Sequence, residues 1–204
     1  MILREAIKFA ALPVLGSAVA FALNAPAAGV VLGVLAGFVV FFFRDPERAV
    51  PAHPAAVVAP ADGRVVRLVE ESHFDRAGRR LSIFLSLWDV HVNRAPVEGR
   101  ILHIQYRPGR FRMAFRNAAS EENEQNIVHL DTPRGPVILW QIAGWVARRV
   151  VLWKGPGETV SRGERLGMIR FGSRVDLWLP EEAQIVVRVG EHVRAGSTVV
   201  AYWQ

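Results

Sequence analysis

The chain has 204 residues, which allows one domain with an added element or two small domains. It contains no cysteine, so disulfides, thiolate nucleophiles and cysteine-based metal sites are excluded. The formal charge is +6, and arginine supplies nearly all of the positive charge because lysine occurs only at Lys8 and Lys154. This balance suits an anionic surface or a phosphate-bearing ligand, whereas no nucleic-acid-binding motif is present and we expect no nucleic-acid partner.

Two apolar runs, residues 7–23 and 27–43, begin the chain and are separated by the turn signal Asn24-Ala25-Pro26. Each run has about 17 residues, at the short end of what crosses a bilayer as a helix. We therefore predict a membrane-associated helical hairpin over residues 1–48, followed by a second domain over residues 49–204.

The form of this membrane attachment stays open. If both runs span, the cations Arg4, Lys8, Arg44 and Arg48 on the two flanks place the rest of the chain in the cytoplasm, at the cell membrane. A cleaved signal peptide ending near Ala25-Pro26-Ala27 and a shallow re-entrant hairpin are the alternatives. The second apolar run predicts membrane attachment in each case.

The second domain is predicted to be mainly β. A Pro/Ala-rich stretch, residues 50–60, has the composition of an extended linker. Short β-branched segments follow, separated by glycine and proline, which favours an antiparallel β-rich domain. These segments are residues 64–69, 81–86, 99–105, 137–142 and 146–153. Residues 121–125 are too polar for a strand and are predicted to form a loop or a helical turn.

A weak internal repeat lies in the C-terminal third. Residues 157–163 match residues 190–196 as G-E-x-V-x-x-G, and an apolar strand follows each copy. The glycines at both ends supply the positive φ that tight turns need. Paired turns of this form are typical of barrel-sandwich domains such as biotinyl and lipoyl carriers. A carrier needs a lysine at a hairpin tip, and neither lysine of the chain is placed there.

Four stretches carry groups suited to chemistry. Asp62 lies in the turn sequence Pro60-Ala61-Asp62-Gly63. Asp89, His91 and Asn93 follow an apolar strand, and alternation would place them on one face of a strand lining a polar site.

The other two stretches lie further along the chain. Arg148 and Arg149 offer paired guanidinium groups that suit a phosphate. Gly172-Ser173 interrupts a strand-like run, where a β-bulge is the ordinary interpretation. His91 and His103 show no metal-binding spacing, so we expect no metal, and no G-x-S-x-G serine-hydrolase motif is present.

Together, in this order, these stretches resemble the phosphatidylserine decarboxylase family of pyruvoyl enzymes, in its short form, which includes archaetidylserine decarboxylases. The resemblance covers essentially the whole chain. The residues that carry it are Phe42-Phe43-Arg44-Asp45-Pro46-Glu47-Arg48, Pro60-Ala61-Asp62-Gly63, Asp89-Val90-His91-Val92-Asn93-Arg94-Ala95-Pro96, Asn123-Glu124, Ile142-Ala143-Gly144 with Ala147-Arg148-Arg149, and residues 163–176 around Gly172-Ser173.

The resemblance implies an autocatalytic zymogen of phospholipid biosynthesis. Ser173 would attack the carbonyl of Gly172 and become a pyruvoyl cofactor, leaving a large chain, 1–172, and a small chain, 173–204. That lyase would decarboxylate the membrane lipid phosphatidylserine to phosphatidylethanolamine through a Schiff base, without metal or pyridoxal phosphate. The exact lipid backbone stays open.

The resemblance also implies roles for individual side chains. His91 is the candidate proton donor, Asp62 matches the acid of an Asp-His-Ser triad, and Arg148 or Arg149 would hold the lipid phosphate. Longer family members carry a second histidine three residues after the first. Here that position is Arg94, which cannot act as a base near neutral pH, so the base of self-cleavage stays open between His91 and Asp62. The alternative function is a non-enzymatic, membrane-tethered barrel-sandwich adaptor.

Overall fold

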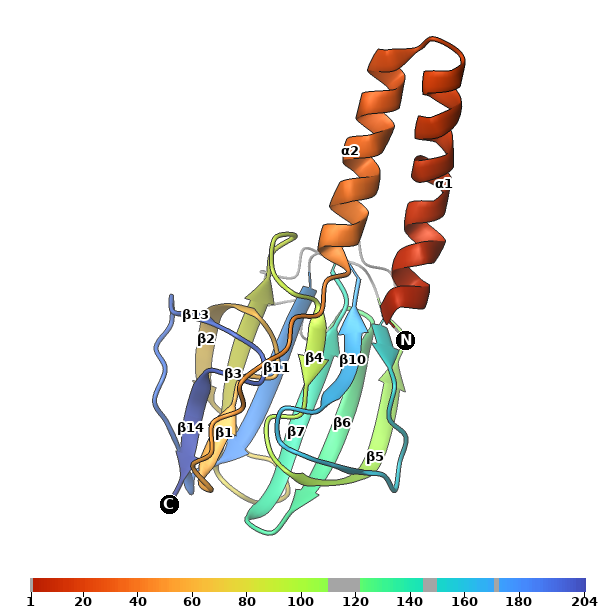
Figure 1. The fold of residues 1–204 in the computed structure, drawn as a ribbon. Coiled ribbons are helices and arrows are strands. Elements are labelled where there is room, and N and C mark those ends of the chain that lie inside the picture. Colours follow the sequence, from red (N-terminus) through yellow and green to blue (C-terminus); the bar gives the residue numbers. More distant parts are fainter. Residues whose placement is uncertain (1, 110–121, 145–149, 171–172) are drawn as a thin grey trace. The chain divides into compact units, whose positions relative to one another are not determined.

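The computed structural model describes residues 2–109, 122–144, 150–170 and 173–204, and side chains from residue 6 onward. The chain forms two compact units, Met1–Pro46 and Glu47–Gln204. The first is helical, and the described residues of the second form mainly β-strands and turns (Figure 1).

The helical unit is an antiparallel hairpin of α1 (Ile2–Ala22) and α2 (Pro26–Phe42). Asn24 adopts φ 57° in the turn, a conformation that asparagine tolerates better than most residues. Proline lies in the first turn of α2, where its missing N–H costs nothing. The helices approach closely at Gly29, whose carbonyl accepts a hydrogen bond of 2.7 Å from Ser17. The predicted helical hairpin is therefore present.

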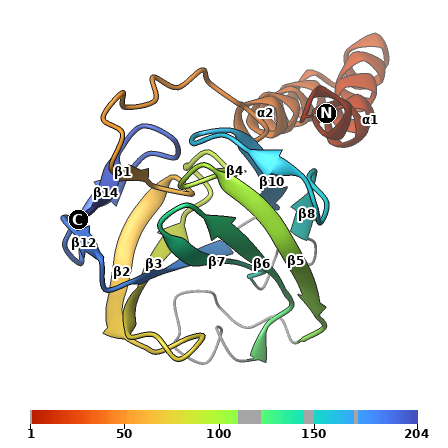
Figure 2. The same ribbon diagram turned by 90° about the horizontal axis from the view of Figure 1, so that it is seen from below.

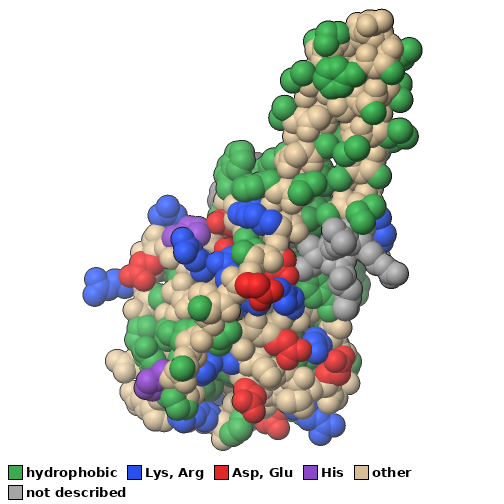
Figure 3. All heavy atoms as spheres, viewed as in Figure 1, with side chains coloured by type: hydrophobic (Ala, Val, Ile, Leu, Met, Phe, Trp, Pro, Cys, Tyr) green, Lys and Arg blue, Asp and Glu red, His purple; other side chains and the backbone are tan. Residues whose placement is uncertain are grey.

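The outer surface of this hairpin is largely hydrophobic (Figure 3). In the part of the chain that the structure describes, neither helix combines the length and apolar character needed to cross a membrane.

Within the described residues, the second unit has fourteen strands in three antiparallel sheets. Their bounds are β1 (Ala56–Val58), β2 (Gly63–Glu70), β3 (Gly78–Leu85), β4 (Val92–Arg94), β5 (Gly99–Arg107), β6 (Gln125–Thr132), β7 (Gly135–Ile142), β8 (Val150–Leu152), β9 (Thr159–Val160), β10 (Arg165–Ile169), β11 (Ser173–Pro180), β12 (Ala183–Ile185), β13 (His192–Val193) and β14 (Val199–Trp203).

The largest sheet has eight strands in the order β13-β2-β3-β11-β7-β6-β5-β9 and curls into a half-barrel (Figure 2). Its concave side and the two small sheets, β1-β14-β12 and β4-β10-β8, enclose the main hydrophobic core. Leu81 and Ile83 on β3 and Val175 and Leu177 on β11 are fully buried in this core. The mainly β, antiparallel class predicted from the sequence is confirmed.

Most predicted strands are present, with two differences. The segment predicted over residues 146–153 appears as β8, while residues 145–149 lie outside the described part. The prediction of a loop or helical turn over residues 121–125 is wrong at its end, because Gln125 begins β6. The polar residues Gln125 and Asn126 at its start give no local strand signal, and pairing with β5 and β7 makes them part of the strand.

The G-E-x-V-x-x-G repeat has a structural counterpart. The four glycines that bound its two copies all have positive φ, from 73° to 98°. The first copy contains β9, which pairs with β5, and the second contains β13, which pairs with β2. The predicted turn conformation is therefore confirmed.

The partners of the two turns are also related in sequence. Residues 59–65 read A-P-A-D-G-R-V and residues 95–101 read A-P-V-E-G-R-I. The turns meet them in the same way: Gly196 donates to Ala59 and Gly163 to Ala95. The strands before them, β1 and β4, pair with β14 and β10 with a bulge at the matching place. The domain thus contains two equivalent, interleaved strand-turn units, in which Asp62 and Glu98 occupy equivalent positions.

Candidate active site

Ser173 is the first residue of β11 and lies opposite Leu85 on β3. Its side chain is fully buried, and its Oγ has no hydrogen-bond partner among the residues that the structure describes. Because side chains alternate along a strand, Ser173 shares its face with the core residues Val175 and Leu177. A buried hydroxyl without a partner is costly and therefore uncommon in a purely structural position. Gly172 lies outside the described residues.

His91 is also fully buried and lies beside the strand that leads to Ser173. Its backbone carbonyl accepts a hydrogen bond of 3.3 Å from the N–H of Ile169, the last residue of β10. In the imidazole, Nδ1 lies 2.9 Å from the carbonyl oxygen of Asp89. A carbonyl only accepts, so Nδ1 carries the hydrogen and the neutral ring presents Nε2 as an acceptor.

Asp89 occupies a turn and not the predicted strand. β4 begins only at Val92, because the Asp89 carboxylate closes a turn by accepting hydrogen bonds from the N–H and hydroxyl of Ser86, at 2.8 and 2.7 Å. The prediction that Asp89 shares a strand face with His91 and Asn93 is therefore wrong. Partial burial raises the pKa of Asp89, but the bonds from Ser86 and from His192 outweigh it, so this pKa lies below its ordinary value.

Asp62 is buried between two partners. Its Oδ2 lies 2.7 Å from Nη2 of Arg48, and its Oδ1 accepts a hydrogen bond of 2.7 Å from the backbone N–H of Ala195. The N–H of Arg94 on β4 donates to the carbonyl of Pro60, which places the Asp62 turn beside the strand that follows His91. The sequence offered no sign of the Arg48 pairing, because Arg48 belonged to a charged flank far from Asp62.

Arg94, three residues after His91, is buried and donates to the carbonyl of Gly163 at 3.1 Å. This contact ties β4 to the first G-E-x-V-x-x-G turn.

Asn93 has a buried polar neighbour that the sequence did not reveal, Gln141 on β7. Its Nε2 donates to Oδ1 of Asn93 at 2.8 Å, and both side chains are fully buried. Gln141 faces Val175 across the β7–β11 pair, two residues from Ser173. The only sequence signal was a single amide within the apolar run 137–142.

The opposite face of β11 carries a separate buried ion pair. The guanidinium of Arg174 contacts both carboxylate oxygens of Asp176, at 2.6 and 3.0 Å, and donates to the hydroxyl of Ser82 at 2.6 Å. This bidentate arrangement fixes the strand immediately after Ser173. Arg148 and Arg149, predicted as phosphate ligands, lie outside the described residues.

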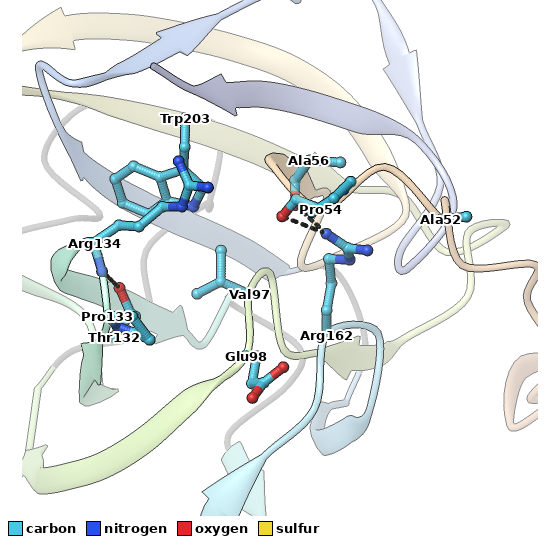
Figure 4. A pocket seen from close by; sticks show the side chains of 10 residues that line it. All are labelled: Ala52, Pro54, Ala56, Val97, Glu98, Thr132, Pro133, Arg134, Arg162 and Trp203. Carbon is cyan, nitrogen blue, oxygen red and sulfur yellow. Dashed lines mark hydrogen bonds between the residues drawn. The ribbon is translucent and has the colours of Figure 1, made fainter.

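A surface pocket of about 420 Å³ occurs elsewhere in this unit and contains none of the predicted site residues (Figure 4). It includes Glu98, the exposed counterpart of Asp62. One of its two arginines, Arg162, donates hydrogen bonds to the backbone carbonyls of Pro51, His53, Pro54 and Ala56. Among the described residues, no group of His, Asp and Glu side chains could hold a metal ion.

The sequence profile of the family described as "Phosphatidylserine decarboxylase" matches residues 35–201. A phosphatidylserine decarboxylase proenzyme of Symbiobacterium thermophilum is 47% identical over 197 residues, covering 92% of this chain and 91% of that protein. Proteins of the same name from Solibacter usitatus and Carboxydothermus hydrogenoformans are 48% and 43% identical, covering 88% and 93% of this chain and 85% and 88% of those proteins. With this similarity over nearly its full length, the chain belongs to the phosphatidylserine decarboxylase family.

Proposed function

We propose that the protein is a phosphatidylserine decarboxylase proenzyme, which cleaves itself between Gly172 and Ser173 and then converts phosphatidylserine to phosphatidylethanolamine. The observation that carries the proposal is the buried Oγ of Ser173, which has no hydrogen-bond partner among the described residues. The similar proteins are themselves named proenzymes, which supports a precursor that matures.

In the proposed cleavage, Oγ of Ser173 attacks the carbonyl carbon of Gly172, and the amide becomes an ester. Loss of the α-proton of Ser173 then expels the Gly172 carboxylate and leaves a dehydroalanine. Tautomerisation and addition of water release ammonia and leave a pyruvoyl group at position 173. For the base that activates Ser173, Nε2 of His91 suits the task better than Asp62, since both Asp62 oxygens already accept hydrogen bonds.

The surroundings of Ser173 fit such a group. The pyruvoyl ketone supplies an electrophile that takes up the substrate amine and the electrons released with CO₂. Burial of Ser173 on the core face of β11 excludes bulk water from that position. His91, held by Asp89, would take up a proton at Nε2 and donate it to the carbon that has lost CO₂.

The small chain 173–204 would remain bound after cleavage. It contains β11, β12, β13 and β14, and β11 lies between β3 and β7 in the middle of the large sheet. Backbone hydrogen bonds on both edges of β11 would hold the two products together without a covalent link.

We further propose that the enzyme works at the cell membrane, with the catalytic domain on the cytoplasmic side. The basic residues beside the hairpin support this side, because the cytoplasmic leaflet carries anionic headgroups that attract them. In the catalytic unit, Leu87 and Trp88 are 41% and 69% exposed on the turn between β3 and β4, directly after the strand that pairs with Ser173. Exposed Trp is typical of membrane interfaces, so this turn would contact the bilayer that holds the substrate.

Two finer assignments rest on residue type and repeat pattern. We propose Arg148 and Arg149 as ligands of the lipid phosphate, because guanidinium groups bind phosphate in a bidentate manner. The paired glycine turns support a barrel-sandwich relationship for the second unit. The alternative of a non-enzymatic adaptor is not favoured, because it leaves the buried Ser173 and His91 without a role.

The direct test is a denaturing gel with intact mass measurement of the purified full chain. We expect two pieces, residues 1–172 and residues 173–204, with the small piece blocked at its start. Ser173→Ala should remain one chain and lack decarboxylase activity, whereas Ser161→Ala, in an exposed turn, should cleave normally. An active protein that stays a single chain would refute the proposal.

A further inference from the structure

Two buried amides, Asn93 and Gln141, join two sheets of the catalytic unit. Asn93 belongs to β4 in a three-stranded sheet, and Gln141 to β7 in the half-barrel. Nε2 of Gln141 lies 2.8 Å from Oδ1 of Asn93, and neither side chain is exposed to solvent. The pair uses only part of its hydrogen-bonding capacity.

The groups of this pair left without a partner are one amide NH₂ and one amide carbonyl oxygen. Nδ2 of Asn93 and Oε1 of Gln141 are buried and have no hydrogen-bond partner among the residues that the structure describes. If the N and O assignments of both amides were exchanged, one NH₂ group and one carbonyl oxygen would still lack a partner among the described residues. Because unpartnered buried polar atoms are costly, this pattern points to a ligand that supplies one acceptor and one donor.

The pair lies on the side of β11 that carries Ser173. Gln141 pairs with Val175, which shares its strand face with Ser173, and Asn93 follows His91 by two residues. A Cβ at Gly167 on β10 would lie 2.2 Å from the carbonyl oxygen of Val151 and 3.1 Å from Nε2 of Gln141, so glycine lets both the β8 backbone and the amide approach β10. The amides and the proposed reacting residues therefore belong to one buried region.

Arg174, the buried cation directly after Ser173, cannot bind the same ligand. Arg174 alternates to the opposite face of β11, where Asp176 and Ser82 occupy its guanidinium. A carboxylate bound on the Ser173 face of β11 would therefore accept hydrogen bonds from the neutral amides and would not contact Arg174.

We propose that the Asn93–Gln141 pair binds the amino-acid end of the serine headgroup, with the amide NH₂ donating to the carboxylate and the amide oxygen accepting from the amine. The inference rests on the proposed function and adds the residues that select the headgroup. It also accounts for product release, because the ethanolamine headgroup has lost the carboxylate and with it the bond from the amide NH₂.

The test uses the full-length Ser173→Ala protein, which cannot mature, and two soluble headgroups, glycerophosphoserine and glycerophosphoethanolamine. Calorimetry should give a preference for glycerophosphoserine of at least about tenfold. Adding Asn93→Asp, which keeps the side-chain shape but puts a carboxylate opposite the ligand's own, should abolish the preference. Gln184→Glu, an equal charge change at an exposed site on β12, should preserve it.

A second readout uses protein with Ser173 intact. Asn93→Asp should cleave itself normally, raise KM for phosphatidylserine at least about tenfold and change kcat less. Gln141→Met, which removes the amide without adding charge, should act in the same direction. Equal binding of the two headgroups, an unchanged preference in both variants, or loss of folding in both would overturn the inference and leave the amides a structural link.

The experiments distinguish failure of the proposed decarboxylase function from failure of the proposed role of the amide pair. If the wild-type chain does not cleave or decarboxylate, the proposed function fails whatever the headgroup binding. If the wild-type chain does both and the Ser173→Ala protein shows no headgroup preference, only the role of the amide pair fails.

Discussion

Arg48 and Asp62 form a buried ion pair, with Nη2 of Arg48 2.7 Å from Oδ2 of Asp62. The pair joins the start of the catalytic unit to the turn that precedes β2. A second arginine, Arg165, makes a comparable contact with Glu47 at 2.9 Å, but there the carboxylate is almost fully exposed. The two pairs therefore allow the effect of burial on an ion pair's contribution to stability to be measured within one protein.

Arg48→Met should lower the free energy of unfolding by about 3 kcal/mol, because it leaves the buried Asp62 charge without its cation. Arg165→Met should lower it much less, since water screens the exposed pair. Urea unfolding of the full chain measures both values. An equal decrease in the free energy of unfolding in the two variants would show that burial does not strengthen the Arg48–Asp62 pair.

His91→Gln should slow self-cleavage and lower decarboxylation by the cleaved fraction at least about 100-fold, since it removes the proposed base and proton donor. Gel densitometry follows cleavage, and CO₂ release normalised to cleaved protein follows turnover. His53→Gln, in the segment before β1, is the control and should be normal in both assays. Normal cleavage with lost turnover would restrict His91 to decarboxylation, and normal turnover would remove it from the mechanism.

The Leu87–Trp88 turn should govern contact with lipid. Replacing both residues by serine should weaken binding of the full chain to anionic vesicles and lower activity on vesicle-bound phosphatidylserine. Activity on monomeric short-chain phosphatidylserine should be retained, because the turn does not belong to the buried site. Leu102→Ser with Tyr106→Ser, which removes two exposed apolar side chains of β5, is the matched control. Similar losses in both double variants would argue against a specific lipid contact.

His129 on β6 should make the fold sensitive to acid. Burial and the neighbouring His103 and His73 lower the pKa of His129 below its ordinary value of 6.5. The unfolded chain therefore takes up this proton before the folded chain does, and stability falls as the pH drops below 6.5 until the folded pKa is reached. His129→Gln should reduce this loss, as thermal unfolding above and below pH 6.5 would show. An identical pH dependence in the variant would contradict the assignment.

Local rules predicted much of the fold. The glycines of the repeated turns need positive φ whatever surrounds them, and all four have it. The alternating apolar segments likewise became β2, β3, β5 and β7. Local rules failed at β6 and at Asp89. At the start of β6, the polar Gln125 and Asn126 lie in a strand because β5 and β7 pair with them. At Asp89, side-chain contacts with Ser86 form a turn, so the next strand begins only at Val92.

The sequence by itself determined the family, the mainly β class, the helical hairpin, and Ser173, His91 and Asp62 as candidate site residues, because these depend on residue type and spacing along the chain. Only the tertiary structure decided which distant groups meet them. Arg48 reaches Asp62, and Gln141 reaches Asn93 beside the Ser173 strand, because sheet register and chain crossing bring together residues far apart in sequence. No local pattern records such pairings, since each depends on how every intervening strand is paired.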